Sequence, residues 1–157
     1  MATIKHFRDL RAWQQCRVVR QRIRLLVKSW PSEEKFRLTD QIIRSSRGPT
    51  SHIAEGYGRF HEKDNVRFCR IARGSLYETQ DHLITACDEG VIEEAVMKEH
   101  VEVIEGTIKT VNAYINYLNS ISGGNYGMVS EPGVIYGHAE MKLSDPPSPE
   151  QPLDADL

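Results

Sequence analysis

The chain has 157 residues, which is enough for one domain with a modest hydrophobic core. No apolar run is long enough to span a membrane, and the charged N-terminus lacks the apolar core of a signal peptide, so we expect a cytoplasmic protein without a membrane partner. The three cysteines, Cys16, Cys69 and Cys87, lack metal-ligand spacing and are expected to be free thiols in a reducing compartment.

The net charge of −2 conceals a strong asymmetry along the chain. Residues 1–75 hold 17 Lys and Arg against 7 Asp and Glu, whereas residues 76–157 hold 3 against 15. Such a division indicates either a face that binds a polyanion or subunits that pair through opposite charges.

The first predicted helix carries an apolar residue at every third or fourth position from Leu10 to Trp30, which forms one stripe along the helix. Pro31 ends this helix, and an acidic pair directly after it favours the start of the next one. The second helix is expected to run to about Arg59. We expect Gly48-Pro49 to kink it, because proline removes one backbone hydrogen bond.

The third predicted helix runs from about Glu62 to Cys87. Its Gly74 is expected to let a neighbouring backbone approach closely, because a glycine inside a helix otherwise costs about 1 kcal/mol relative to alanine. The fourth helix carries an unbroken seam of three- and four-residue steps from Met97 to Leu118, which is typical of coiled-coil packing. The inward face of the third helix is expected to use Phe68, Ala72, Ser75, Thr79, Leu83 and Ala86.

Four amphipathic segments joined by short connections predict an all-α fold, an antiparallel up-and-down four-helix bundle within residues 1–121. Residues 122–157 differ in composition, with five of the seven prolines, five glycines, and six acidic residues against one lysine. This composition predicts a disordered acidic C-terminal tail.

Several motifs resemble a known family in the order in which they occur along residues 7–120. They are Trp13-Gln14, Pro31 with Glu34, Gln41-x-x-Arg44, Ile53-Ala54-Glu55-Gly56-Tyr57-Gly58-Arg59 and Gly74-Ser75-Leu76-Tyr77-Glu78. The family is the bacterial four-helix-bundle family of 23S rRNA intervening-sequence proteins, which is related to the accessory proteins of diversity-generating retroelements. The chain departs from the family pattern at Arg37, where glycine is common, and between Ser45 and His52, where the proline comes one place early. The resemblance implies a ring-like homopentamer, nucleic-acid binding and a reverse transcriptase as a candidate partner.

A basic stripe is the first candidate site. Arginines recur at helical spacing on the first helix, away from its apolar face, and a shorter basic row follows on the third helix. Guanidinium groups pair bidentately with phosphate, so we expect phosphate contacts from arginines in particular. The open alternatives are a solvated helix face and pairing with the acidic fourth helix of another subunit. The candidate residues are Arg11, Arg17, Arg20, Arg24, Lys28, Arg44, Arg47, Lys63, Arg67 and Arg70.

A second set contains Glu55, Arg59 and Arg73. A carboxylate held by arginine in a helix bundle is most often an ion pair that fixes the helix register, so we expect a structural role. Arg73 on the third helix is expected to reach Glu55 if the two helices run antiparallel.

No site for a metal or a cofactor is predicted. A di-iron bundle needs paired Glu-x-x-His motifs, whereas the chain offers His52-x-x-Glu55 in reverse order and Glu78-x-x-x-His82 at the wrong spacing. Phosphate loops, dinucleotide fingerprints and nucleophile elbows are absent from the sequence. We therefore expect a non-enzymatic, oligomeric, nucleic-acid-associated accessory protein. The alternative is a homo-oligomeric scaffold that binds another protein and no nucleic acid.

Overall fold

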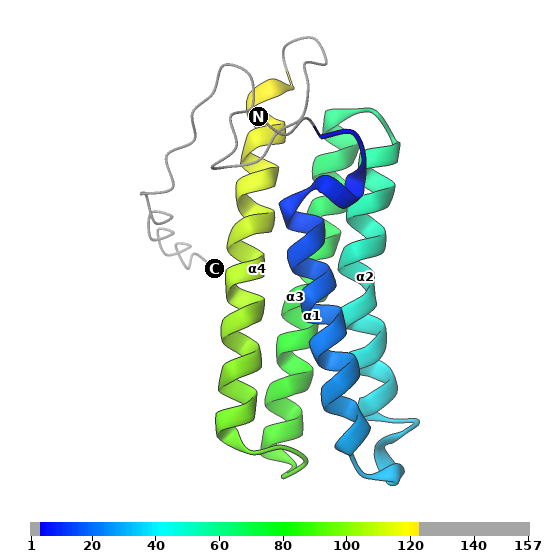
Figure 1. Ribbon diagram of the computed structural model, residues 1–157, viewed down its shortest axis with the longest axis vertical. Coiled ribbons are helices and arrows are strands. Elements are labelled where there is room, and N and C mark those ends of the chain that lie inside the picture. Colours follow the sequence, from blue (N-terminus) through cyan, green and yellow to red (C-terminus); the bar gives the residue numbers. More distant parts are fainter. Residues whose placement is uncertain (1–3, 123–157) are drawn as a thin grey trace, which may run out of the picture.

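Four long helices build an antiparallel bundle in the computed structural model, which describes residues 4–122 (Figure 1). The helices are α1 (Arg11–Leu26), α2 (Leu38–Gly58), α3 (Glu62–Asp88) and α4 (Glu94–Ile121), with short 3-10 helices η1 (Phe7–Asp9), η2 (Val27–Ser29) and η3 (Ser32–Glu34). Residues 4–122 contain no strand, so the predicted all-α four-helix bundle is confirmed. The predicted tail, residues 122–157, lies outside the described residues apart from Ser122.

The helices are arranged so that each one packs against two neighbours (Figure 1). The α1 helix contacts α2 and α4, and α3 contacts the same two helices from the opposite corner. Consequently α1 and α3 stand diagonally across the bundle. None of the helices in residues 4–122 is long and apolar enough to cross a membrane.

The predicted stripe on the first helix faces the core, with Cys16, Val19 and Ile23 buried. Two details differ from the prediction. The α1 helix ends at Leu26, and Trp30 is buried beyond it after a 3-10 turn. Trp13 is only half-buried, because it lies at the edge of the stripe.

The seam of α4 is the clearest success of the sequence pattern, since its positions from Ile104 to Leu118 are buried. Tyr114 and Tyr117, which lie beside the seam, are buried as well. Both tyrosines therefore pack inside the bundle.

The second helix begins later than its acidic pair suggests. Glu34 lies in η3 and its carboxylate accepts a hydrogen bond of 3.3 Å from the backbone N–H of Leu38, where α2 starts. The helix then continues without a break through the buried Pro49 as far as Gly58. Pro49 therefore does not interrupt α2, and the expected kink stays a prediction.

The prediction that Gly74 lies at a close contact between helices is wrong. Gly56 on α2 lies at such a contact instead. A Cβ added at Gly74 would meet open space, because this position faces solvent. A Cβ at Gly56 would lie 2.8 Å from Asn65 Oδ1 and 2.9 Å from Phe68 Cβ, so α2 and α3 approach closely there. The inward face of α3 also includes Leu76, while Phe68 and Ser75 are half-buried.

Candidate nucleic-acid interface

A groove with a volume of about 930 Å³ runs between α1 and α2. Five arginines line it: Arg17, Arg20 and Arg24 from α1, and Arg44 and Arg47 from α2. Among residues 4–122, no aspartate and no glutamate line the groove. The groove therefore concentrates positive charge between two helices of one chain.

Helical spacing explains the position of each arginine. Steps of three and four residues align Arg17, Arg20 and Arg24 along one side of α1, about 90° around the helix from the core residue Ile23. On α2, Arg44 and Arg47 are three residues apart and face the same groove. The two rows become opposite walls only because α1 and α2 pack as antiparallel neighbours.

The arginines of the groove are held to different degrees. Arg20 Nη1 donates a hydrogen bond of 3.0 Å to Thr50 Oγ1 across the groove, and the Thr50 hydroxyl donates to the backbone carbonyl of Arg47 at 3.0 Å. Arg44 pairs with the exposed carboxylate of Asp40 at 3.2 Å on the same helix, a type of ion pair that contributes little to stability. Within residues 4–122, Arg24 and Arg47 pair with no carboxylate. The positive charges of Arg24 and Arg47 are therefore available to bind an anion.

The sequence interpretation missed the aromatic end of the groove. Phe7 and the half-buried Trp13 line this end, with ring centroids 5.4 Å apart and an interplanar angle of 63°. The Arg17 guanidinium lies 6.0 Å from the centroid of the Trp13 ring. Trp13 had been placed in the core stripe, yet it lies four residues before Arg17, and this spacing is the signal that puts both on one face.

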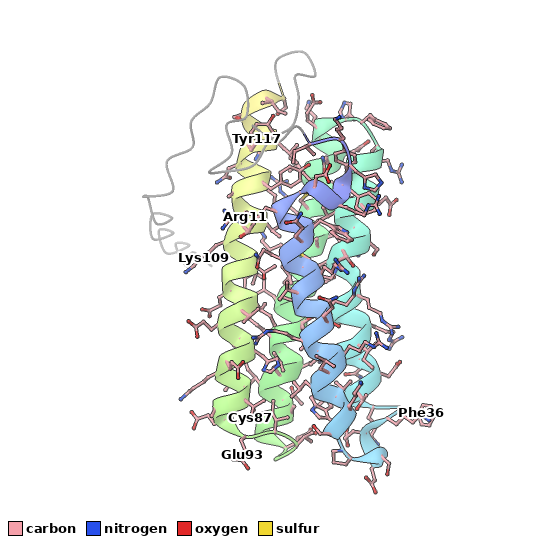
Figure 2. The ribbon with its side chains drawn as sticks, in the orientation of Figure 1. Arg11, Phe36, Cys87, Glu93, Lys109 and Tyr117 are labelled. Carbon is pink, nitrogen blue, oxygen red and sulfur yellow. The ribbon has the colours of Figure 1, made fainter. Side chains whose placement is uncertain are left out.

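The other predicted phosphate-binding residues lie away from the groove. Arg11 is eleven residues from Arg22, which is about three helical turns, so both face the α4 side of α1 (Figure 2). Lys28 is exposed in η2. The row of Lys63, Arg67 and Arg70 is exposed on α3, the helix diagonal to α1.

The second predicted set is divided between two contacts. Arg59, the residue directly after α2, places its Nη2 2.7 Å from Oε1 of the exposed Glu55, four residues earlier. Arg73 does not reach Glu55, and its Nη1 instead donates a hydrogen bond of 2.8 Å to Asn112 Oδ1 on α4. The prediction that Arg73 reaches Glu55 and fixes the register of α2 and α3 is therefore wrong, because Arg73 joins α3 to α4.

The acidic helix α4 contributes a differently charged side of the bundle. Glu99 accepts a hydrogen bond of 3.0 Å from Arg22 Nη1 on α1, and Glu94 pairs with Lys98 at 2.6 Å. Glu93 at the start of α4 and Lys109 further along it are both exposed (Figure 2). The basic groove and the acidic helix therefore occupy different sides of α1.

Reactive side chains are not gathered in the described part of the chain. Among residues 4–122, no three His, Cys, Asp or Glu side chains lie close enough together to hold a metal ion. Burial raises the pKa of the Cys69 thiol to about 12 and also raises the pKa of Cys16, where the nearby Cys69 adds to the effect. Both buried thiols are therefore protonated at neutral pH, and a thiol in that state is a poor nucleophile.

The sequence model of the family described as 23S rRNA-intervening sequence protein matches residues 8–113, which include all five arginines of the groove. A search of curated proteins finds no match.

Proposed function

Because the chain belongs to the 23S rRNA-intervening sequence protein family, we propose that it is a non-enzymatic accessory protein that binds nucleic-acid phosphates in the groove between α1 and α2. One observation carries this proposal: five arginines from two helices line a single groove, and no acidic residue among residues 4–122 lines it with them. Arginine binds phosphate bidentately and stays charged at all physiological pH values.

We also propose where the protein acts, how many copies assemble and which protein it binds. The family resemblance supports a cytoplasmic homo-oligomer, with five copies as the expected number, and a reverse transcriptase as the candidate protein partner. Phosphate contacts position a nucleic acid without reading its bases, so binding in the groove should show little sequence preference. Affinity should fall steeply with salt, because bound phosphates release their counterions.

The test reverses the charge of one wall of the groove. The triple variant Arg17→Glu, Arg20→Glu, Arg24→Glu should lose nucleic-acid binding and keep its helix content, because these positions avoid the core. The matched control Lys63→Glu, Arg67→Glu, Arg70→Glu makes the same change in charge on the far side of the bundle and should retain binding. Equal losses in both variants would show that overall charge matters and that the groove does not.

A second candidate function is a scaffold without nucleic acid, which the acidic carboxylates of α4 favour. In that case the α1 arginines would face α4 of a neighbouring subunit. The triple reversal would then lower the mass of the oligomer in solution. Measuring both the mass and the nucleic-acid affinity of this variant distinguishes the two functions.

A further inference from the structure

The groove is too narrow for a double helix to enter. It lies between two neighbouring helices of one bundle, and packed helices are about 8–10 Å apart between their axes. From Trp13 to Arg24 it extends over eleven residues of α1, or about 16 Å at the helical rise. A duplex could only rest on the rim, whereas the backbone of one strand can lie between the two rows of arginines.

The arginines are distributed in a way that suits one strand. Three come from α1 and two from α2, so a strand along the groove would have guanidinium groups on both sides. The bond between Arg20 and Thr50 at 3.0 Å joins the two walls and holds one guanidinium within the groove. A flat basic face that suited duplex DNA would present its cations on one side only.

The aromatic end of the groove offers a ring on which a base can stack, which a site for phosphate alone does not need. Trp13 is half-buried in the groove lining, and its neighbours there are the Phe7 ring at 5.4 Å and the Arg17 guanidinium at 6.0 Å. A distance of 6.0 Å is at the outer limit of a cation–π contact, so this contact is weak and an incoming ring could replace it. Aromatic side chains beside a basic groove are the common means by which proteins bind unpaired bases.

We propose that the groove binds a single-stranded segment of nucleic acid, with one unpaired base stacked on Trp13 and the following phosphates between the arginines. This inference rests on the proposed function and specifies the class of ligand. A strand without secondary structure, either RNA or DNA, satisfies the geometry. Paired nucleic acid does not, because its bases are stacked on one another and cannot reach Trp13.

The test uses the two tryptophans of the chain. Trp30 is buried, with 8% of its surface exposed, and Trp30→Phe leaves Trp13 as the single tryptophan of the chain. This variant, as the full chain, is titrated with a 12-nucleotide oligo-uridine, with oligo-deoxythymidine of the same length, and with a 12-base-pair duplex. We expect the single strands to quench Trp13 fluorescence in a saturable manner and to bind at least ten-fold more tightly than the duplex.

A second variant tests the stacked base directly. Trp13→Leu should weaken single-strand binding by about ten-fold and leave duplex binding unchanged, since stacking on an aromatic residue is commonly worth that much. Duplex binding as tight as single-strand binding, with no quenching of Trp13, would overturn this inference. The proposed function would survive that result if the triple arginine variant still lost affinity for the duplex. Failure of all three ligands to bind would overturn both.

Discussion

Arg20 on α1 donates a hydrogen bond of 3.0 Å to the hydroxyl of Thr50 on α2, and this bond joins the two walls of the basic groove. Thr50 is buried with 3% of its surface exposed, while Arg20 is half-buried and has N–H groups without a partner within residues 4–122. A guanidinium held in this way loses less conformational freedom when it binds a phosphate. The two residues thus connect the stability of the bundle with its proposed function.

Replacing the acceptor tests this connection. Thr50→Val keeps the branched shape of the side chain and removes the hydroxyl, so we expect the free energy of unfolding to fall by about 1 kcal/mol. Nucleic-acid affinity should fall by a few-fold, because Arg20 is no longer fixed. Ser51→Ala is the matched control, since the exposed Ser51 hydroxyl donates a hydrogen bond to the Gly48 carbonyl of its own helix, and it should change neither quantity appreciably. Denaturant titration and a binding isotherm measure the two effects, and unchanged affinity for Thr50→Val would refute the positioning role.

Two glycines should respond to alanine with opposite signs. Gly56→Ala would place a Cβ 2.8 Å from Asn65 Oδ1 and 2.9 Å from Phe68 Cβ, so we expect α2 and α3 to be forced apart at a cost of about 1–3 kcal/mol. Gly74→Ala adds a methyl group in open solvent and should stabilise α3 by about 0.5–1 kcal/mol through helix propensity. Thermal unfolding of both variants measures the difference. A stabilised Gly56→Ala variant would show that the two helices are not in close contact there.

These glycines show where sequence patterns lose their predictive power. Periodicity located the four helices and the buried seam of α4, because side-chain spacing repeats within each helix. Which glycine lies at a close contact depends on how two helices are rotated against each other, and that is decided by packing across the bundle. The partner of Arg73 was predicted wrongly for the same reason, since Asn112 lies on another helix and 39 residues further along the chain.

The groove was predictable in part. The row of Arg17, Arg20 and Arg24 was visible in the spacing of α1. Its convergence with Arg44 and Arg47 was not, because local sequence does not specify which helices become neighbours. The position of Trp13 in the groove could not be predicted, because an apolar side chain at this spacing is compatible with both the core and the groove.

Alkaline pH should destabilise the bundle through its two buried thiols. Burial raises the pKa of Cys69 from its ordinary value of 9.0 to about 12, and it raises the pKa of Cys16 as well. Above pH 9 the unfolded chain releases these protons while the folded chain retains them, so the free energy of unfolding should fall as pH rises. The expected slope is about 1 kcal/mol per pH unit for each thiol between pH 9 and 10. Stability curves of the double variant Cys16→Ala, Cys69→Ala should lack this thiol-dependent slope. An equal slope in both proteins would assign it to other groups.

The salt dependence of binding should identify the arginines that touch phosphate. Each phosphate contact on a single strand contributes about −0.7 to the slope of log affinity against log salt concentration. Five arginines in the groove give a limiting slope of about −3.5 if each one neutralises a phosphate. Arg24→Gln removes one cation that has no carboxylate partner within residues 4–122, so its slope should be less steep by about 0.7. Arg67→Gln removes one cation from the exposed row of α3 and should leave the slope unchanged, although both variants have the same net charge. If Arg67→Gln reduced the slope and Arg24→Gln did not, the phosphate-binding face would be α3, and the groove between α1 and α2 would have no part in binding.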